Sequence, residues 1–561
     1  MDVTSLSKPH YLVSCIVSAV LFLAVSMLLY YRNKHSYWQS KGVIGPKPLP
    51  VLGNLLPLLL EDRMQLEKDR LRDYGKVYGI YQGSEPHLVV SDAELIRQIS
   101  IKDFDTFTNH DTSQFLNKYE KEFLFIIKDD RWKHVRSILS CTFTSGKIKR
   151  MYKLLDTCSN DLVEAFLEEF KHSGVMHLMK MFNMYTMDAI ATCCYGMKLQ
   201  RQSGTTTTSS AASGDNFIRI TAKIFEMQWS RLIAATVFPN YFLEKLDFHL
   251  NDPNNFKPLS DVAERLLRSR RHQMKEKKFD DYMQLLIEAR SDDRLELDEL
   301  DSQENHHAGL TAESLIADRD LLAKRSSQKE DYKRKTLTDT EILSSTMLLL
   351  AAGLEPTATL LTHCVYALAF HRDVQERLYE EIAKVAEWDG TKTSITFDYD
   401  SLTTCRYMDA VISETLRTLA PALITNRVSS RDYYIEKYNI HLPKSSKVIL
   451  SLYAAMNDPD YWHEPDSFDP DRFMPGNKEG IVPGSYCPFG LGPRHCLAMR
   501  FVLTESKIAL AKLMMSFQFD AAPNTKFPPS SATAFNINKI KNPYVRLIKR
   551  SNASLANRFN T

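Results

Sequence analysis

The chain has 561 residues, of which 44% are hydrophobic and 25% are charged, a balance that is ordinary for a globular protein. Its formal net charge is +2, so there is no basic excess of the kind that binds nucleic acid, and no nucleic-acid partner is expected. The nine cysteines are odd in number and show no zinc-site spacing, which favours a reducing compartment.

The N-terminus carries a long apolar run. Tyr11 to Tyr31 contains no charged residue, and as a helix it would span roughly 30 Å, about the thickness of a bilayer's hydrocarbon core. A cleaved signal peptide is the competing interpretation, but the run is long and no A-x-A site precedes the basic residues after it. Because those basic residues outnumber the single Lys8 before the run, we expect 1–10 in the lumen, a single-pass anchor at 11–31 and a cytosolic domain beyond.

The next elements are a stiff segment and short strands. Residues 32–54 are basic and then rich in proline, which predicts an extended hinge, with a plain linker as the alternative. Val77–Gln82 and His87–Val90 predict one pair of strands, and Ile435–Leu442 and Lys447–Leu452 predict another. Helical patterns dominate between them, so we expect a mainly α protein with small β-sheets.

Two stretches have the composition of inserted loops. Residues 202–214 are low-complexity Ser, Thr, Gly and Ala, and residues 291–335 are highly charged with few aromatics. Between them stands an aromatic cluster, for which apolar core is the default interpretation: Phe225, Trp229, Phe238, Tyr241 and Phe242.

A long helix follows the second insertion. Thr338 and Glu341 form a capping-box pattern, and the apolar run continues from Ile342 to about Phe370. Glu355 and Pro356 in its middle argue against a second membrane span and favour a buried helix over a cofactor.

Two helices carry polar residues at helical spacing. Trp132 and Arg136 stand one turn apart, so both side chains can meet one anionic group. The alternative is that this helix face is exposed, but an exposed position would leave the tryptophan side chain without a role. Glu414 and Arg417 share a face of an amphipathic helix, a pairing that is common on any helix surface.

The most informative segment is the loop around Cys496. A thiolate is a strong, soft ligand for iron, and a helix predicted from Leu497 to Met515 would stabilise its charge with N-terminal amide groups. Arg494, two residues away, could answer a carboxylate on a cofactor. The alternative for a lone cysteine is a buried structural role.

This loop resembles the haem-thiolate loop of the cytochrome P450 family, Phe-x-x-Gly-x-Arg-x-Cys-x-Gly. Phe489, Gly492, Arg494 and Cys496 match, and Ala498 stands where the family usually has glycine. The resemblance implies a cytochrome P450 fold for the haem domain at 55–548, followed by a C-terminal tail at 549–561. Residues 130–147 are most similar to the microsomal branch that oxidises drugs and steroids and also includes thromboxane synthase. That similarity implies the endoplasmic reticulum membrane.

The resemblance also implies the cofactor and its contacts. Heme b (iron protoporphyrin IX) would be bound by iron to Cys496, and a buried triad of Glu414, Arg417 and Arg472 would lie behind the loop. His110 stands where this branch often has arginine. The implied cofactor-binding residues are Trp132, Arg136, Arg427, Phe489, Gly492, Arg494, Cys496 and His110.

The activity implied is monooxygenation of a lipophilic small molecule (a sterol, fatty acid or xenobiotic). Electrons would come from NADPH through cytochrome P450 reductase, with cytochrome b5 as a further partner. A basic surface would attract the acidic reductase: Lys133, Lys147, Lys149 and Arg150. Apolar pocket walls are expected from Met347–Leu350, Ala422–Thr425 and Ala534–Ile537, and the aromatic cluster would form a pocket roof and a membrane-facing entrance.

The long helix departs from the family's Ala-Gly-x-Glu/Asp-Thr pattern. Ala352, Gly353 and Glu355 match, but Pro356 replaces the threonine that helps deliver protons, and Thr357 follows it. Proline removes the N–H that would bond the carbonyl of Ala352, so a groove can open there for water or dioxygen. Glu355 and Thr357 are then the expected proton-relay residues, and a simple packing kink is the alternative.

Two other functions stay open at this point. Family members that rearrange peroxides also lack this threonine, so an isomerase of a lipid peroxide or endoperoxide is one alternative. A haem-binding sensor without catalytic activity is the other. Reductase-dependent NADPH consumption linked to product would separate the monooxygenase from both.

Overall fold

The structure is a computed structural model, and it describes residues 8–140, 142–197, 228–238, 240–274, 281–288, 336–387, 395–532 and 537–550. The two predicted insertions lie outside these residues, as does all of the predicted tail after residue 550.

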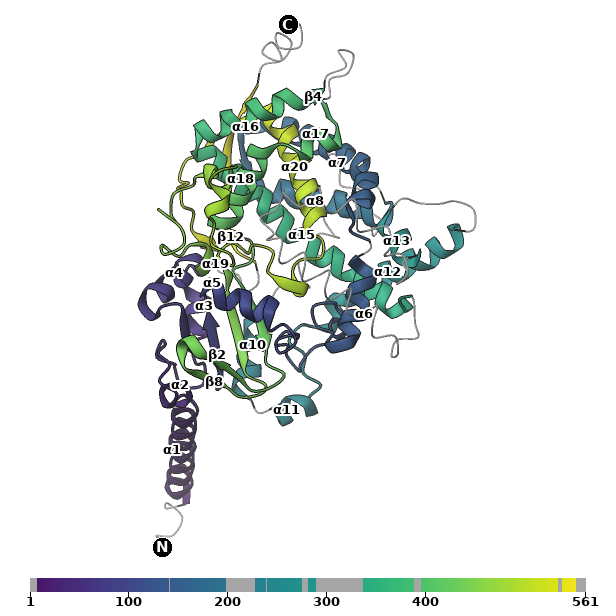
Figure 1. Cartoon of the computed structure of the whole chain (residues 1–561). Coiled ribbons are helices and arrows are strands. Elements are labelled where there is room, and N and C mark those ends of the chain that lie inside the picture. Colours follow the sequence, from purple (N-terminus) through teal and green to yellow (C-terminus); the bar gives the residue numbers. More distant parts are fainter. Residues whose placement is uncertain are drawn as a thin grey trace.

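The described residues form a mainly helical body with small sheets, as expected (Figure 1). The helices are α1 (Lys8–Lys34), α2 (Tyr37–Ser40), α3 (Leu56–Leu60), α4 (Arg63–Tyr74), α5 (Ala93–Arg97), α6 (Asp129–Ser140), α7 (Ser145–His172), α8 (Leu178–Tyr195), α10 (Trp229–Val237), α11 (Asn240–Lys245), α12 (Pro253–Gln273), α13 (Tyr282–Glu288), α15 (Asp339–Phe370), α16 (Arg372–Val385), α17 (Tyr399–Thr403), α18 (Arg406–Thr418), α19 (Leu452–Met456) and α20 (Met499–Ser516). The strands are β1 (Val77–Gln82), β2 (Glu85–Val90), β3 (Val175–His177), β4 (Ala386–Glu387), β5 (Thr396–Phe397), β6 (Ile424–Val428), β7 (Tyr433–Ile435), β8 (Ile440–Leu442), β9 (Lys447–Ser451), β10 (Phe517–Ala521), β11 (Ser531–Ala532), β12 (Lys539–Ile540) and β13 (Tyr544–Lys549).

The largest sheet has the strand order β1-β2-β9-β6. The first predicted strand pair is confirmed as the antiparallel hairpin of β1 and β2. The second predicted pair is wrong, because Asn439 adopts a left-handed conformation (φ +51°) that splits Ile435–Leu442 into β7 and β8, which pair with each other. β9 pairs instead with β2 and β6.

Helix α15 crosses the centre of the body and packs against α8, α18 and α20 (Figure 1). Its capping box is present: the Thr338 side chain accepts from the Glu341 backbone N–H, and the Glu341 carboxylate accepts from the Thr338 N–H at 2.8 Å. The helix continues through Pro356 without a break. The buried residues that follow, among them Ala358 and Leu361, supply apolar packing that offsets the lost backbone hydrogen bond.

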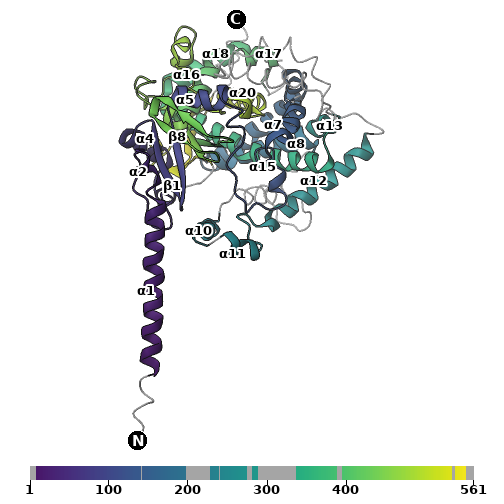
Figure 2. The same ribbon diagram turned by 60° about the horizontal axis from the view of Figure 1, so that its bottom comes forward.

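Helix α1 projects away from the body, with the N-terminus at its far end (Figure 2). Among the described residues, two helical segments are long and apolar enough to cross a membrane, Val13–Ser40 and Asp339–Phe370. The second is largely buried in the protein, whereas the apolar window of the first is fully exposed. We therefore assign α15 to the core and α1 as the candidate membrane anchor.

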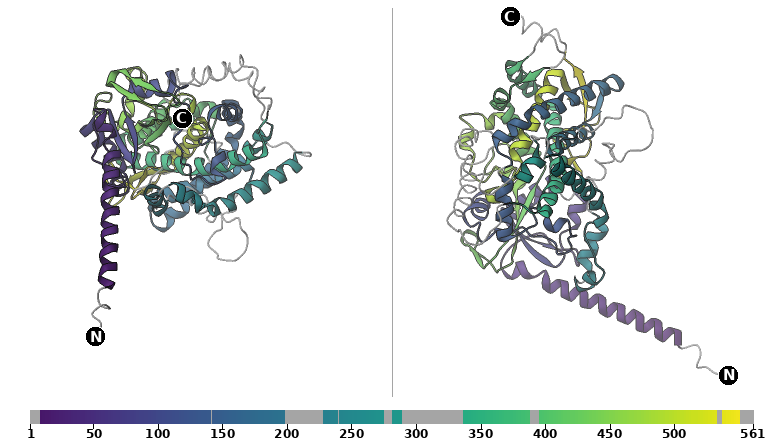
Figure 3. Two further views of the ribbon diagram at one scale, coloured as in Figure 1. Left: turned by 90° about the horizontal axis from the view of Figure 1, so that it is seen from below. Right: turned by 90° about the vertical axis from the view of Figure 1, so that its right-hand side faces the viewer.

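The segment after α1 is packed against the first sheet (Figure 3). The Gly79 N–H donates to the Ile44 carbonyl at 2.8 Å, and a Cβ on Gly45 would lie 1.9 Å from the Gly79 carbonyl oxygen. The buried Trp38 indole donates to the Ile80 carbonyl at 3.1 Å. Glycine at positions 45 and 79 thus allows the predicted hinge to dock on β1.

Candidate functional site

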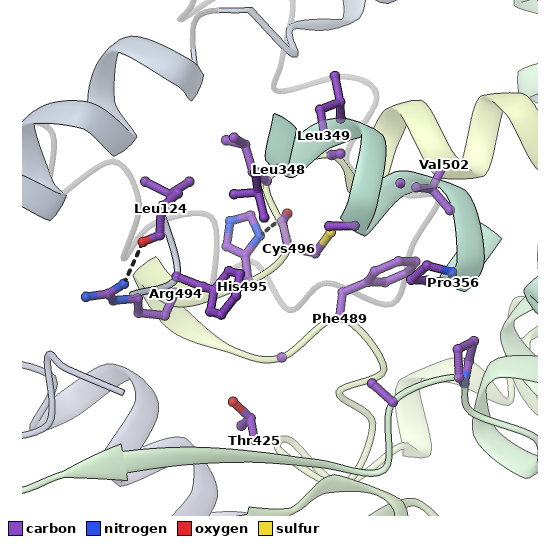
Figure 4. A pocket seen from close by; sticks show the side chains of 18 of the residues that line it. Leu124, Leu348, Leu349, Pro356, Thr425, Phe489, Arg494, His495, Cys496 and Val502 are labelled. Carbon is purple, nitrogen blue, oxygen red and sulfur yellow. Dashed lines mark hydrogen bonds between the residues drawn. The ribbon is translucent and has the colours of Figure 1, made fainter. Parts of the chain in front are cut away.

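One cavity of about 410 Å³ lies between the cysteine loop, α15 and β6 (Figure 4). Cys496 and Phe489 face it from the loop, and Leu348, Leu349 and Pro356 face it from α15. Its apolar lining comprises Leu124, Phe125, Leu139, Phe143, Leu348, Leu349, Ala352, Leu360, Leu416, Ala422, Ile424, Leu452, Leu497, Ala498 and Val502, among others. No Asp or Glu occurs among the described residues that line it.

The loop folds tightly enough to aim the Cys496 sulfur at the cavity. The Cys496 N–H donates to the Phe489 carbonyl at 2.8 Å, closing the loop. Gly492 has φ +68°, and a Cβ there would lie 1.9 Å from the Ser100 carbonyl oxygen, so only glycine fits. Helix α20 begins at Met499, three residues after the cysteine.

The charge on Cys496 has local support. Burial raises the pKa of the thiol, while a hydrogen bond from the Ala498 backbone N–H and the charge of Arg136 lower it. These last two effects stabilise a thiolate, as a metal-bound sulfur requires. Ala498 has φ −93°, so the residue that replaces the usual glycine needs no left-handed backbone, and its methyl group borders the cavity.

Arg136, Arg427 and Arg494 converge on one end of the cavity. Burial lowers the pKa of Arg427, and burial together with Arg427 and Arg136 lowers the pKa of Arg494, an effect that Asp129 offsets only in part. A guanidinium does not lose its proton at ordinary pH, so the lowered values mean that the positive cluster is unfavourable as it stands. The cluster therefore fits an anionic ligand group.

Arg494 also ties the loop to its surroundings. Its Nε, Nη1 and Nη2 atoms donate to the carbonyls of Thr108, Leu124 and Ile127 at 3.0, 3.2 and 3.1 Å. The guanidinium lies 3.9 Å from the centre of the buried Trp132 ring. Each Nη atom keeps one further N–H for an anion.

His110 lies beside Arg427 at the cavity. Its Nδ1 is 2.9 Å from the Asn426 carbonyl oxygen and 3.1 Å from Nη1 of Arg427. Burial and the two arginines Arg427 and Arg494 hold the pKa of His110 well below its usual range, so the ring is neutral. Nε of Arg427 has no hydrogen-bond partner among the described residues, although the side chain is buried.

Behind the loop, the structure brings Glu414, Arg417 and Arg472 together. Arg417 donates to both carboxylate oxygens of Glu414 at 2.7 Å, and both side chains are fully buried. Nε of Arg472 lies 3.5 Å from the same carboxylate. Arg417 also donates to the carbonyls of Met456 and Ser467 at 3.1 Å, so the triad fixes the chain before the cysteine loop.

The two expected relay residues do not line the cavity. The carboxylate of Glu355 forms an ion pair with Lys539 of β12. The hydroxyl of Thr357 donates to the Gly353 carbonyl at 2.8 Å, and the side chain is buried in the packing of α15. Pro356 and Ala352 do line the cavity, and Pro356 has no N–H to donate to the Ala352 carbonyl.

Several wall residues were not anticipated from the sequence. Leu124 and Tyr282 line the cavity from segments with no recognisable local motif, and Phe143 lines it from the segment 130–147, whose motif did not mark it as a wall residue. Of the expected walls, Leu348, Leu349, Ala422, Ile424 and Thr425 line it. Met347, Leu350, Leu423 and Ile537 are not among its lining residues, and 534–536 lie outside the described residues.

The aromatic cluster is not core. Phe238, Tyr241 and Phe242 are exposed, and none of the described members of the cluster lines the cavity. They lie on and next to α10 and α11, at the end of the body from which α1 leaves (Figure 2). Phe225 lies outside the described residues.

Comparison with known proteins agrees with this geometry. The family model for cytochrome P450 matches residues 44–546. The chain belongs to the cytochrome P450 family. It is 30% identical to mouse (Mus musculus) cytochrome P450 3A11 over 518 residues, which are 91% of this chain and 92% of that protein. It is also 30% identical to human (Homo sapiens) cytochrome P450 3A5 over 520 residues, covering 91% and 93% of the two chains.

Membership identifies the chain as a haem-dependent monooxygenase, an oxidoreductase whose family draws electrons from NADPH through a reductase. The residues present fit the cofactor. Cys496 offers a sulfur ligand at a helix N-terminus, and the arginine cluster offers charge for the propionates.

Proposed function

We propose that this P450 oxidises a lipophilic small molecule at the endoplasmic reticulum membrane, with electrons from cytochrome P450 reductase. The observation that carries the proposal is the cavity itself. It joins a cysteine sulfur and a cluster of arginines to walls that are otherwise mostly apolar. Such walls favour an apolar substrate over a charged one, because no carboxylate among the described lining residues could pair with a cationic ligand.

Different residues would bind different parts of the haem. Cys496 would hold the iron, while the Ala498 N–H and the positive end of α20 stabilise the sulfur's charge. Arg136, Arg427 and Arg494, with Trp132 and His110 beside them, would hold the propionates. When bound, the haem supplies activation of dioxygen, which the electron-rich thiolate favours.

The walls contribute by excluding water. Leu348, Leu349, Phe143 and Ile424 surround the cavity with apolar side chains that would orient the substrate. Glu355 of α15 would be the proton source. Its ion-pair partner Lys539 is about one-third exposed, so the pair is in contact with solvent.

We propose a single-pass topology with the haem domain in the cytosol. The basic residues after α1, and the exposed apolar side chains of Phe238, Tyr241 and Phe242 at the same end of the body, support a membrane lying along that end. Asn552-Ala553-Ser554 is a glycosylation sequon that a cytosolic domain leaves unused. Glycosidase treatment of protein from microsomes should leave its electrophoretic mobility unchanged, and a mobility shift would contradict the topology.

The reductase would dock on the basic surface of α6 and α7. Lys133 is paired with Asp130 at 3.3 Å, and Lys149 is paired with Asp400. Lys147 and Arg150 stand on the first turns of α7 and add two further basic side chains to this surface. Cytochrome b5, also acidic, would compete for it.

A peroxide isomerase is the second candidate, and Pro356 at the cavity wall favours it. The test is reconstitution of the full-length protein with reductase, NADPH and a panel of lipophilic compounds. The monooxygenase consumes NADPH in proportion to an oxygenated product. Rearrangement of a lipid endoperoxide without NADPH, or haem binding with no turnover in either assay, would overturn the proposal.

A further inference from the structure

The residues of α15 that line the cavity form one stripe along the helix. Between positions 345 and 356 they are Ser345, Leu348, Leu349, Ala352, Gly353 and Pro356. Steps that alternate between three residues and one keep all of them on a single helix face, which runs beside the cavity for about three turns. Ser345 carries the one polar side chain among these six.

The hydroxyl of Ser345 is available to a molecule in the cavity. The residue is buried, yet its hydroxyl forms no hydrogen bond with any residue that the structure describes. Its neighbour Ser344 differs, because that hydroxyl donates to the Glu341 carbonyl at 3.2 Å and the residue does not line the cavity. Buried polar groups nearly always have a partner, so the Ser345 hydroxyl requires one from inside the cavity, either water or a bound molecule.

The other polar side chains of the described lining have partners or an expected role with the haem. Tyr282 of α13 shares a hydrogen bond with the Thr142 side chain. The rest belong to the cysteine loop or to the arginine cluster and its neighbours. Thr425 is one of these, since its hydroxyl accepts from Nη1 of Arg427 at 3.3 Å and its side chain points from β6 toward the loop (Figure 4). Ser345 is therefore the polar lining residue that is left for a substrate.

The position of Ser345 on α15 sets how a bound molecule would lie. Cys496 lies between Leu348 and Pro356 in the close view of the cavity (Figure 4). Ser345 is one turn beyond Leu348, on the side away from Pro356, and two turns, or about 10 Å along the axis, from Ala352. A molecule that binds Ser345 at one end therefore passes Leu348 and Leu349 before it reaches the sulfur of Cys496.

We propose that Ser345 is a substrate-binding residue that holds a neutral oxygen atom of the substrate and thereby selects which carbon is oxidised. A serine hydroxyl donates to a carbonyl oxygen and accepts from a hydroxyl, so a ketone or an alcohol fits. An ion does not fit, because two leucines flank Ser345 and its hydroxyl brings no charge to offset the desolvation of an ion.

The substrate class is thus an elongated lipophilic molecule with an oxygen at one end and the oxidised carbon about 10 Å away, the length of two helix turns. This inference rests on the proposed monooxygenase function, for which it narrows the substrate.

The test uses haem ligands of increasing chain length. 1-Alkylimidazoles bind haem iron through a ring nitrogen and change the haem absorption spectrum, and each is paired with an analogue whose chain ends in a hydroxyl group. Both series are titrated into the full-length haem-loaded protein. Ser345→Ala removes the hydroxyl, and Ser344→Ala is the matched control at the adjacent position. Alanine is the best helix former, so α15 should be retained in both variants.

In the wild type, the hydroxyl-ended ligand should bind roughly threefold to tenfold more tightly than its alkyl analogue at one chain length, and shorter pairs should show no such preference. Ser345→Ala should abolish the preference and leave the affinities of the alkyl series within roughly twofold, while Ser344→Ala should retain it. A preference that persists in Ser345→Ala, or none at any length in the wild type, would overturn the proposal. Absence of NADPH-dependent product in the wild type would instead overturn the proposed function, because the titration requires no turnover.

Discussion

Two groups of buried arginines in this protein differ in what neutralises them. Arg417 is fully buried against a carboxylate of its own chain, Glu414, and donates further to two carbonyls. Arg427 is as deeply buried, but it lies beside Arg494 and Arg136 in a cavity whose described lining has no carboxylate. The first group is complete within the polypeptide, whereas the second becomes favourable only with an anion. Burial alone therefore does not separate a structural charge from a binding charge, but the location of the counter-charge does.

The largest effect on stability is expected from a substitution of Arg417, whose charge is neutralised by Glu414 within the polypeptide. Arg417→Met leaves the Glu414 carboxylate buried without its main partner, which should cost about 3–5 kcal/mol of unfolding free energy and prevent haem incorporation. Arg268→Met is the control, because Arg268 forms an exposed ion pair with Glu264 and should cost less than about 1 kcal/mol. For both variants, denaturant unfolding measures the unfolding free energy and the haem absorption band measures haem incorporation. A normal spectrum in Arg417→Met would show that the triad is dispensable.

Removing an arginine from the cavity should weaken cofactor binding without lowering the stability of the fold. Arg427→Met should weaken haem binding roughly tenfold to a hundredfold, since a hydrogen bond to a charged group contributes about 1.5–3 kcal/mol. The unfolding free energy of the haem-free protein should stay equal or rise, because an uncompensated buried charge is lost. Arg431→Met, at an exposed position four residues on, is the control. Haem titration measures the affinity, and unfolding of the haem-free form measures the stability. A variant whose haem-free form loses its fold would contradict the comparison.

A buried carboxyl group without a cationic partner tests the comparison with the opposite sign. Glu505 of α20 is buried, one carboxyl oxygen has no partner, and burial raises its pKa well above the ordinary 4.5. The folded state therefore holds a proton that the unfolded state loses above pH 4.5, so this group reduces stability as pH rises from there toward the folded pKa. Glu505→Gln should remove that dependence. The difference in unfolding free energy between the two proteins should be constant below pH 4.5, where the carboxyl group is protonated in both states, and should change as the pH rises above 4.5. A difference that stays constant with pH throughout would refute the assignment.

The smallest effect is expected at Thr357. Its hydroxyl is already bonded to the Gly353 carbonyl, so Thr357→Val should lower the unfolding free energy by about 1 kcal/mol or less. Peroxide release per NADPH should stay within roughly twofold of the wild type, because the side chain does not line the cavity. A large rise in peroxide would restore the relay role expected for this residue from the sequence.

Local sequence was sufficient where the chemistry is local. The residues of the Cys496 loop lie within ten positions, and the capping box of α15 lies within four, so their spacing fixed their geometry in advance. The β1–β2 hairpin was predictable for the same reason. The strand at 435–442 failed because one left-handed residue, Asn439, turned the chain back.

Long-range contacts were not predictable. Lys539 and Glu355 form an ion pair although they are 184 residues apart in the sequence, and no pattern in either segment predicts it. Whether Thr357 or Thr359 bonds to its own helix depends on side-chain rotamers that packing selects. The exposed aromatics beside α10 and α11 were interpreted as core because periodicity reports an apolar face and not what covers it.

The carbon monoxide difference spectrum of the reduced full-length protein tests most directly whether Cys496 ligates haem iron through a thiolate. The wild type should give the red-shifted band for which the family is named, and Cys496→Ser should lose it while its far-ultraviolet circular dichroism stays that of a folded helical protein. The same red-shifted band in Cys496→Ser, or its absence from a wild type that has taken up haem, would contradict the account.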